Sequence, residues 1–379
     1  MKIFHLSDLH LGKRLCEYSL IDDQQYILDR ILDAADAEHP DAIIIAGDVY
    51  DKPIPSAEAV ALFDSFITAL AARAIPTFVI SGNHDSPERI AFGAGVMGVG
   101  GIYMSPVFEG DITPIRLSDG HGDIYFYLLP FIKPAHVRRV YPDDECTSYT
   151  DALAIAISHM NIDESARNVL VTHQFVTGAS RSESEEISVG GSDNVDASVF
   201  ECFDYTALGH IHGPQSISRE NIRYSGTPLK YSFSEAGHTK SITCVTLGKK
   251  GDVSIDTIPL IPLRNLREIR GSFDTLTSPS YYENEAREDY LHVTLTDEED
   301  APEALTRLRA IYPNLMKLDY DNTRTRAKGT LSLETAHEKR SPLELFCDFF
   351  EMQNGRAPND SQREYLSALI EKIWEVDDK

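Results

Sequence analysis

The sequence is poor in cysteine and in positive charge. Its 379 residues include five cysteines, an odd number without CxxC spacing, which argues against a disulfide framework or a zinc knuckle. Lys and Arg number 35 against 60 Asp and Glu, giving a formal net charge of −25. A protein that holds nucleic acid by itself usually carries a basic stripe. A polyanionic substrate would therefore need bound cations or a partner protein to attract it.

Long apolar runs are also missing. No segment approaches the length of a membrane span, and the N-terminus lacks the basic-then-apolar layout of a signal peptide. We therefore expect a soluble, cytoplasmic protein with no membrane contact. Internal repeats and low-complexity segments are absent. With 42% hydrophobic and 25% charged residues, the composition is that of a globular protein, and the length predicts two or three domains.

The first and largest predicted domain covers residues 1–263 and alternates short β-rich runs with helical stretches, as α/β domains do. Near-continuous apolar runs predict strands covered on both faces. These strands lie at 3–6, 41–47, 75–82, 168–173 and 205–210, with helices at 22–38 and 56–73. Three later runs, at 222–226, 241–247 and 252–258, predict a second, more antiparallel set of strands.

Two smaller parts follow. Residues 264–335 predict a small βαβ-like module with a helix near 302–311. Residues 336–379 predict two helices. The first has Ser341 as N-cap, Pro342 at the first helical position and Glu344 completing a capping box, and the second repeats this with Ser361 and Glu364.

Apolar residues recur at helical spacing in both predicted tail helices. They include Leu345, Phe346, Phe349, Phe350, Leu366, Leu369 and Ile370. Two short helices cannot bury this much apolar surface against each other alone. They must dock either on the main domain or on a partner helix, and the residues by themselves leave both possibilities open.

Polar clusters follow five of the predicted strands in the first domain. They contain Asp8 and His10, Asp48 and Asp51, Asn83 with His84 and Asp85, His173, and His210 with His212. In α/β sheets, ligands bind beyond the carboxyl ends of the strands. Asp8 and His10 are two residues apart, so an extended segment would point both the same way. We expect Gly47, Gly82 and Gly209 to let the chain turn sharply where each strand ends.

Each of these side chains has an ordinary structural role if it is considered alone. Asp85 reads as a helix N-cap, and Asp51 or Asn83 as a turn residue. Together, however, uncompensated buried carboxylates at neighbouring strand ends would repel at a cost of several kcal/mol each. A pair of cations removes that conflict. Carboxylate, imidazole and amide donors suit Mn, Fe or Zn, and a dinuclear site of this kind hydrolyses phosphoesters.

The order D-x-H, G-D-x-x-D, G-N-H-D, H and G-H-x-H is similar to that of the calcineurin-like metallophosphoesterases. The stretches HLSDLHLGK, AGDVYDKPIPS, SGNHDS, ALGHIH and YSGTPLKYSFSE resemble the SbcD-type nuclease subunits of bacterial SbcCD exonucleases. The resemblance covers essentially the whole chain and is weakest after residue 264. It implies an α/β fold with a metallophosphoesterase β-sandwich flanked by helices, a small α/β capping domain and a helical C-terminal tail.

The resemblance also implies roles for the site residues. One metal would be held by Asp8, His10, Asp48 and His212, and a second by Asp48, Asn83, His173 and His210. His84 would not be a ligand. His84 would be oriented by Asp85, and it would stabilise the transition state or protonate the departing oxygen. Asp51 would contact the metal ligands without binding a metal itself. Manganese is the usual activating metal of the family, with iron and zinc as alternatives.

For function, the resemblance implies a metal-dependent DNA nuclease of DNA repair, replication and recombination, acting as a double-strand 3'-5' exonuclease and a single-strand and hairpin endonuclease. It implies a homodimer, DNA as substrate, and the coiled-coil ATPase SbcC as partner, docked on the 336–379 helices. One alternative is another phosphoesterase: a phosphomonoesterase, a cyclic-nucleotide phosphodiesterase or a protein phosphatase. Lys52 and Pro53 after Asp51 disfavour the last of these. The other alternative, a non-catalytic scaffold, conflicts with the complete set of ligands.

Overall fold

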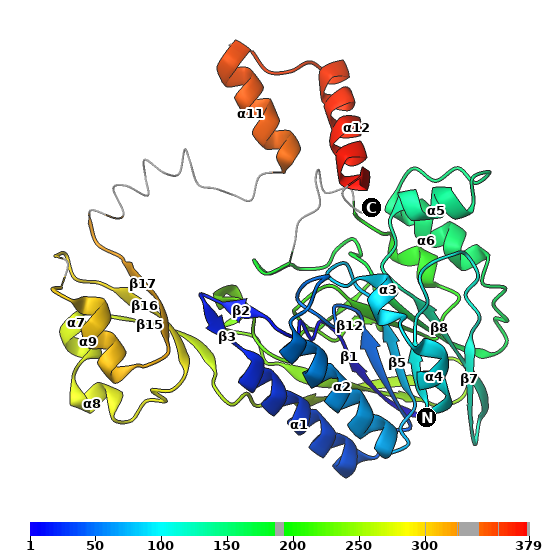
Figure 1. Ribbon diagram of the computed structural model, residues 1–379, viewed down its shortest axis with the longest axis horizontal. Helices are drawn as coiled ribbons and strands as arrows, with labels where there is room; N and C mark the ends of the chain where they lie inside the picture. Colours follow the sequence, from blue (N-terminus) through cyan, green and yellow to red (C-terminus); the bar gives the residue numbers. More distant parts are fainter. Residues whose placement is uncertain (186–192, 300, 324, 326–340, 355, 377–379) are drawn as a thin grey trace.

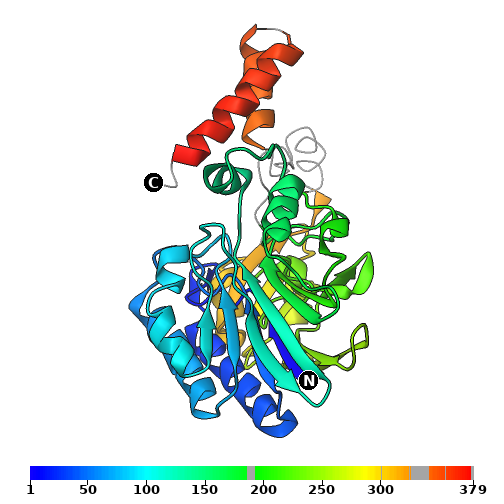
Figure 2. The same ribbon diagram turned by 90° about the vertical axis from the view of Figure 1, so that its right-hand side faces the viewer.

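The computed structural model describes residues 1–185, 193–299, 301–323, 325, 341–354 and 356–376. Within these residues, two six-stranded mixed sheets pack face to face, and helices cover the outer face of each (Figures 1 and 2). The predicted α/β sandwich flanked by helices is confirmed. No helix in the described part of the chain is both long and apolar enough to span a bilayer.

The first sheet has the strand order β14-β13-β1-β4-β5-β6. Its central strands β1, β4, β5 and β6 are parallel, whereas β13 and β14 extend it antiparallel. The strand bounds are β1 Lys2–Leu6, β4 Ala42–Ala46, β5 Thr77–Ile80, β6 Ile102–Met104, β13 Ser241–Leu247 and β14 Val253–Pro259. A two-stranded ribbon of β2 (Arg14–Leu15) and β3 (Tyr18–Ser19) follows β1.

The second sheet has the order β11-β12-β10-β9-β8-β7, parallel from β12 to β8 and antiparallel at both edges. Its bounds are β7 Ile115–Asp119, β8 Gly122–Leu129, β9 Arg167–His173, β10 Tyr205–Gly209, β11 Gln215–Ile217 and β12 Arg219–Tyr224. The predicted second, more antiparallel set does not form a unit of its own, although β13 and β14 are antiparallel as expected. β12 joins the second sheet in parallel, and β13 and β14 complete the first, because a strand's sheet is decided by long-range pairing that local pattern does not encode.

Helices form the two outer layers of the sandwich. On the first sheet lie α1 Ile21–Glu38 and α2 Ala57–Ala72, with α3 Pro87–Ile90 and α4 Ala94–Val99 between β5 and β6. On the second lie α5 Pro134–Val140, α6 Tyr149–Ser158 and the 3-10 turn η2 Ala197–Phe200. A second 3-10 turn, η3 Phe233–Glu235, precedes β13. Between the sheets, Phe78 stacks on Phe126 with ring centroids 4.2 Å apart.

A three-stranded parallel sheet with its own apolar core follows the sandwich, and we call it the cap module (266–320). Its elements are β15 Leu266–Gly271, α7 Phe273–Leu276, α8 Pro279–Tyr282, β16 Tyr290–Leu295, α9 Ala304–Ile311 and β17 Leu315–Tyr320. The βαβ-like pattern expected here is present. The proposed limit at 335/336 lies outside the described residues, and the division into 1–263, 264–335 and 336–379 stays a prediction.

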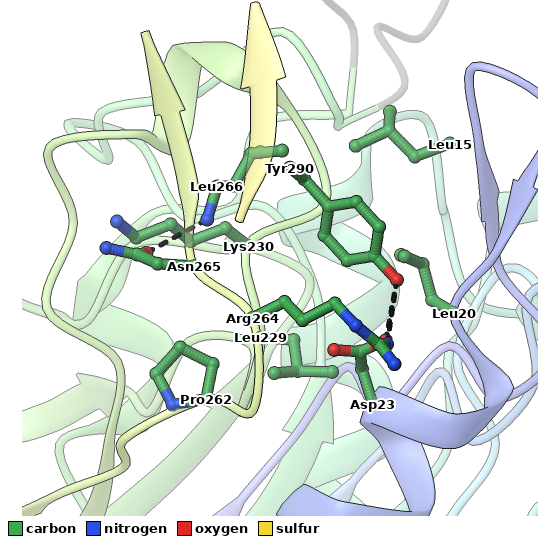
Figure 3. A pocket seen from close by; sticks show the side chains of 10 residues that line it. All are labelled: Leu15, Leu20, Asp23, Leu229, Lys230, Pro262, Arg264, Asn265, Leu266 and Tyr290. Carbon is green, nitrogen blue, oxygen red and sulfur yellow. Dashed lines mark hydrogen bonds and ion pairs between the residues drawn. The ribbon is translucent and has the colours of Figure 1, made fainter. Parts of the chain in front are cut away.

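Asp23 of α1 joins the cap module to the sandwich. Its Oδ2 accepts a hydrogen bond of 2.7 Å from the Tyr290 hydroxyl and one of 2.6 Å from Nη1 of Arg264, beside a small cavity of about 20 Å³ (Figure 3). Asp23 is only 3% exposed. A buried carboxylate requires such partners, so the junction is a fixed contact between the two parts.

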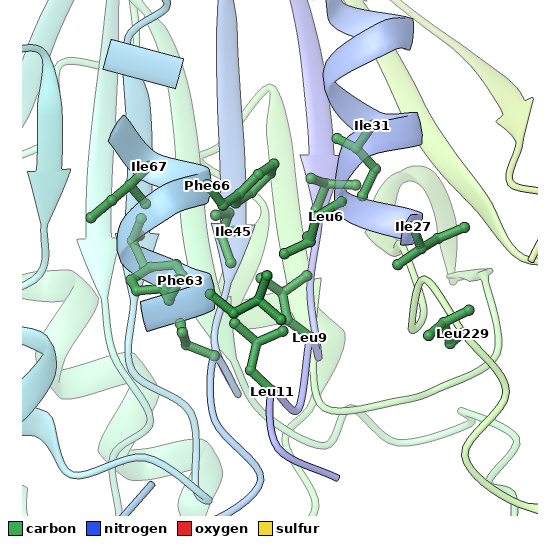
Figure 4. Close-up of a cluster of buried hydrophobic side chains, with 14 of the residues drawn as sticks. Leu6, Leu9, Leu11, Ile27, Ile31, Ile45, Phe63, Phe66, Ile67 and Leu229 are labelled. Carbon is green, nitrogen blue, oxygen red and sulfur yellow. The ribbon is translucent and has the colours of Figure 1, made fainter. Parts of the chain in front are cut away.

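A buried cluster beneath α1 and α2 fixes the chain that leaves β1. Leu9 and Leu11 lie beyond the end of the strand, yet both are buried among Leu6, Ile27 and Phe63 (Figure 4). Burying two leucines contributes about 3–6 kcal/mol relative to exposing them. This packing holds the loop in place and leaves the intervening polar residues to face the other way.

The tail contains α11 Pro342–Asn354 and α12 Asp360–Val376, which pack against each other. The predicted capping box of α11 is confirmed, since Ser341 N–H donates to Glu344 and Glu344 N–H donates to Ser341. The prediction for the second helix is wrong. Its box pairs Asn359 with Gln362, two residues before Ser361 and Glu364, because Asn is also a good N-cap and Gln serves in place of Glu.

Candidate metal centre

All seven predicted ligands lie at one edge of the sandwich. They follow the carboxyl ends of β1, β4 and β5 in the first sheet and of β9 and β10 in the second. The loops after β1 and β4 run side by side, because Asp8 N–H donates to the Gly47 carbonyl at 3.0 Å and His10 N–H to the Asp48 carbonyl at 2.9 Å. The backbone N–H of His210 donates to the Asp8 carboxylate at 3.0 Å, which links the two sheets at the site.

One half of the site, the Asp8 half, consists of Asp8, His10 and His212. Their donor atoms all lie within 4.8 Å of one another. The Nε2 atoms of His10 and His212 face each other at 3.2 Å. All three side chains are buried.

The other half, the Asn83 half, consists of Asn83, His173 and His210. The Asn83 Oδ1 lies 3.0 Å from Nε2 of His173 and 3.0 Å from Nδ1 of His210. Asp48 stands between the halves, with its Oδ2 3.3 Å from Nε2 of His173 and 3.6 Å from Nε2 of His10. A single carboxylate oxygen therefore faces both halves.

The ring nitrogens are arranged as ligands of cations. Nδ1 of His173 lies 2.9 Å from the Ala46 carbonyl, to which it donates, so its Nε2 is the atom turned into the site. For His10 the atom turned into the site is Nε2, which faces His212, and for His210 it is Nδ1, which faces Asn83. Among the described residues, the other nitrogen of each of these two rings is buried without a hydrogen-bond partner. Carboxylate, amide and imidazole atoms that converge at these distances fit two divalent cations.

The backbone is strained at the site. Asp8 and Asp48 have φ angles of +53° and +49°, and His10 and His210 have +44° and +104°. These left-handed conformations cost about 1–3 kcal/mol each for residues other than glycine. They also correct the expectation that Asp8 and His10 project together from an extended segment. β1 ends at Leu6, and two left-handed residues turn both side chains to the site.

The three glycines act differently from what we expected. Only Gly47 needs a positive φ, of +85°. A Cβ at Gly82 would lie 2.1 Å from Oδ1 of Asp48, and one at Gly209 would lie 1.8 Å from the Ala46 carbonyl oxygen. At Gly82 a side chain would collide with the Asp48 carboxylate, and at Gly209 it would collide with the backbone of β4, so close packing and not a positive φ favours glycine at both positions.

Burial sets the electrostatics of the cluster. It raises the pKa of Asp8 to about 6, and it lowers the pKa of His10 and of His210 well below the usual value for histidine. For His173, burial is outweighed by the neighbouring Asp48 carboxylate, which raises the pKa to about 9. The carboxylates and imidazoles are thus held together against their preferred ionisation, and bound cations would relieve the conflict.

His84, Asp85 and Asp51 lie beside the ligands. Nδ1 of His84 is 3.1 Å from the Asp51 carbonyl oxygen, and the ring lies 4.9 Å from that of His10. The Asp85 carboxylate instead accepts backbone N–H groups of Val49, Tyr50 and Gly82 at 2.9–3.0 Å. The Asp51 carbonyl, and not Asp85 as expected, therefore orients His84. Asp85 instead joins the loop after β4 to the loop after β5.

The Asp51 carboxylate pairs with Lys13 and lies 3.8 Å from the orphaned Nδ1 of His10. The Asp51 carboxylate is thus near the predicted ligand His10 but is not hydrogen-bonded to it.

Sequence reasoning missed a second set of residues behind His212, of which Glu185 and Glu235 are buried. The imidazole Nδ1 lies 2.8 Å from the Ser184 hydroxyl and 3.2 Å from Oε1 of Glu235. The His212 N–H donates to Glu185 at 2.7 Å. Glu235 belongs to the stretch YSGTPLKYSFSE, which was quoted only for its resemblance. A buried acid in a 3-10 turn carries no distinct sequence signal.

The predicted partner-binding residues lie on α11 and α12. Leu345, Phe346, Phe349 and Leu369 are exposed to 51%, 39%, 54% and 39%. Phe350, Leu366 and Ile370 are half-buried. The four exposed side chains are not covered by the sandwich or the cap module within the described residues.

Two family models match the chain. The model of the calcineurin-like phosphoesterases matches residues 1–214, and the SbcD_C model, described as the type 5 capsule protein repressor C-terminal domain, matches residues 262–354. The first match contains every predicted metal ligand. The second contains the cap module and α11.

Solved structures similar to the chain include TT1561 of Thermus thermophilus, at 12% identity and a TM-score of 0.40, covering 68% of this chain and 98% of that one. A dimetal phosphatase from Danio rerio has 12% identity and a TM-score of 0.39, covering 69% of this chain and 96% of that one. Both TM-scores are low, so the family assignment rests on the family models.

Proposed function

Since the chain belongs to the calcineurin-like phosphoesterases, a family of metal-dependent hydrolases, we propose that it is an SbcD-type nuclease subunit that hydrolyses the phosphodiester bonds of DNA. The observation that carries the proposal is the position of Asp48. One of its oxygens faces His10 at 3.6 Å and His173 at 3.3 Å. A shared carboxylate between two sets of donors is the arrangement that a two-metal phosphoesterase requires.

The donor set fits two divalent cations. Asp8, His10 and His212 would hold one of them, Asn83, His173 and His210 would hold the other, and Asp48 would contact both. When bound, the cations supply Lewis-acid charge at the phosphate and an activated water at neutral pH. The mixture of carboxylate, amide and imidazole favours Mn, Fe or Zn over Mg or Ca, and we propose Mn²⁺ as the activating ion.

His84 is our proposed acid. Its Nδ1–H donates to the Asp51 carbonyl, which directs the ring and leaves Nε2 for the substrate. As an imidazolium, His84 would donate its Nε2 proton to the departing sugar oxygen and stabilise the charge that develops there. The backbone N–H of His84 donates to Asp48 at 2.9 Å, so the acid is fixed relative to the shared ligand.

The C-terminal match supports DNA as the substrate, and the net charge supports the need for a partner. The SbcD_C match covers residues 262–354, which a minimal phosphoesterase does not need. A net charge of −25 repels a phosphate backbone at long range. We therefore propose that the cations bind the scissile phosphate and that a coiled-coil ATPase of the SbcC type supplies much of the remaining attraction.

The exposed apolar residues of α11 and α12 support a partner helix as the occupant of that face. Phe346, Phe349 and Leu369 would pack against the coiled coil of the ATPase, as a helix packs into a hydrophobic groove. A chain ending at residue 335 should lose capture of purified ATPase. Equal capture by the truncated and full chains would contradict this docking site.

A homodimer is the second proposed assembly. Phe92, Val96 and Val99, near and on α4, are exposed to 82%, 81% and 91%, which is unusual for neighbouring large apolar side chains. We propose that a second copy of the chain covers them. Replacing Val96 and Val99 with Asp should convert a dimer into a monomer in light scattering, and an unchanged mass would contradict the assignment.

The nuclease assay tests the proposed function. Linear duplex DNA should release nucleotides with Mn²⁺, faster when the ATPase partner is present, and not with a chelator. Hydrolysis of a chromogenic phosphate monoester without any release from DNA would identify a phosphomonoesterase instead. Inactivity on both substrates with bound Mn²⁺ would favour a scaffold.

A further inference from the structure

Three atoms of His212 contact polar groups behind the site. Its N–H donates to Glu185 at 2.7 Å, its carbonyl accepts from Nζ of Lys240 at 2.9 Å, and its Nδ1 faces Ser184 and Glu235. Glu235 has an exposed fraction of 0%.

The hydrogen bonds behind His212 have only one consistent direction. Glu235 forms a buried ion pair with the ammonium group of Lys240, so its side chain is a carboxylate. The carboxylate therefore only accepts hydrogen bonds. The Ser184 hydroxyl donates to Glu235, so its oxygen is free to accept from Nδ1–H of His212. The proton of the neutral imidazole is thus on Nδ1, and the lone pair is on Nε2.

The lone pair on Nε2 faces His10 across the Asp8 half, at 3.2 Å from the other Nε2. Lys240 is itself fully used, since its Nζ donates to the His212 carbonyl, Thr227 and Glu235. Lys240 and Glu235 thereby hold each other in place, and they contact the backbone carbonyl and the ring of His212 respectively. Carboxylate partners of this kind orient histidine ligands and raise their basicity.

We propose that Glu235 is a positioning residue for the metal of the Asp8 half: it fixes the tautomer and orientation of His212 so that Nε2 binds the cation. The inference rests on the two-metal centre of the proposed function. It predicts a change confined to one of the two sites, since the side-chain hydrogen bonds of Glu235 within the described residues reach no ligand of the Asn83 half.

The test is titration of the full-length, metal-free chain with Mn²⁺ in a calorimeter, followed by the visible absorption of Co²⁺ in its place. The variants are Glu235→Ala, Glu235→Gln, which keeps an acceptor oxygen, and the control Arg167→Met. Arg167 is 4% exposed and pairs with Asp119 at the other end of β9, so its loss breaks a partly buried ion pair away from the site.

We expect the wild-type chain to bind two Mn²⁺. Glu235→Ala should keep one site and weaken the other by about 10–100-fold, with a changed Co²⁺ spectrum. Glu235→Gln should recover part of that loss, and Arg167→Met should bind as the wild type does. If Glu235→Ala does not fold, the loss in Glu235→Gln decides.

Three results would overturn the inference. Wild-type affinities at both sites in both Glu235 variants would show that His212 needs no such partner. An equal loss in Arg167→Met would show that destabilisation alone weakens metal binding. A wild-type chain that binds no Mn²⁺ would remove the proposed metal centre and the inference with it, which distinguishes that failure from the first two.

Discussion

His10 and His212 face each other with their Nε2 atoms 3.2 Å apart, although the residues are 202 positions apart in the chain. Two nitrogen ligands at about 2.0–2.1 Å from one tetrahedral cation stand about 3.3 Å apart. The spacing of these two nitrogens therefore suits the shared cation that we propose for the Asp8 half. Strained backbone at His10, buried leucines on either side of it and the partners of His212 maintain that spacing.

Replacing His84 with Ala should abolish hydrolysis without emptying the metal centre. The side chain is the proposed proton donor and is not among the proposed ligands, so we expect a loss of about 10²–10⁴-fold in the rate of nucleotide release. Metal content and the unfolding midpoint should match the wild type. His121→Ala, at an exposed position, is the matched control. An active His84→Ala enzyme would rule out the assigned role.

Gly209→Ala should damage the site more than the addition of one methyl group suggests. The added Cβ would lie 1.8 Å from the Ala46 carbonyl oxygen and 2.7 Å from Nδ1 of His173. Overpacking of this kind costs about 1–3 kcal/mol or more. Urea unfolding should show a lowered midpoint, together with reduced metal content. Gly237→Ala, where a Cβ meets nothing within 4 Å, should leave both unchanged. Equal behaviour of the two variants would contradict the close approach.

Metal binding should release a proton at neutral pH. The pKa of His173 without metal is raised to about 9 by Asp48 despite burial, so the ring is protonated at pH 7, whereas a metal ligand must be neutral. This proton stabilises the metal-free fold below the ordinary pKa of histidine, and that contribution disappears as the pH rises through 9. Mn²⁺ affinity should therefore increase between pH 7 and 9.

Calorimetry in buffers of different ionisation enthalpy measures that proton. We expect about one proton released per chain at pH 7 and fewer at pH 9.5. Replacing His173 with Asn should remove the release. A wild-type enthalpy that is the same in every buffer would contradict the assigned protonation.

Tyr290→Phe should loosen the junction between the cap module and the sandwich. It removes the O–H that donates to buried Asp23 at 2.7 Å and leaves Arg264 as partner. A hydrogen bond to a charged group contributes about 1.5–3 kcal/mol, so the urea midpoint should fall. Tyr365→Phe, at a side chain that is 70% exposed, should have no effect. Identical midpoints for the two variants would contradict a fixed junction.

The sequence predicted the five ligand clusters because each follows an apolar run that ends in polar residues. Strands β4, β5, β9 and β10 are buried throughout, so their continuous apolar pattern predicted buried strands correctly. Parallel strands then bring the ends to one edge. The residue pattern could not predict the positive φ angles of Asp8 and His10, since a left-handed conformation depends on what packs around the loop.

The remaining misses share a physical cause, which is contact between distant segments. The partners of Asp85 are backbone amides of residues 49, 50 and 82, and local pattern does not show which carboxylate accepts from which amide. Glu235 and Ser184 are 51 residues apart and meet only behind His212. Strand β13 likewise pairs with β1, which lies at the opposite end of the sandwich sequence. The pattern of apolar residues within β13 therefore could not predict which sheet the strand joins.

The metal content of Asp48→Asn and Asp8→Asn, measured side by side after loading with Mn²⁺, tests the two-metal centre most directly. Asp48 faces both halves, whereas Asp8 belongs to one, so the wild type should hold two Mn²⁺ per chain, Asp8→Asn about one, and Asp48→Asn should lose affinity at both sites. Retention of one tightly bound Mn²⁺ in Asp48→Asn, or loss of both in Asp8→Asn, would contradict a centre that is joined through Asp48.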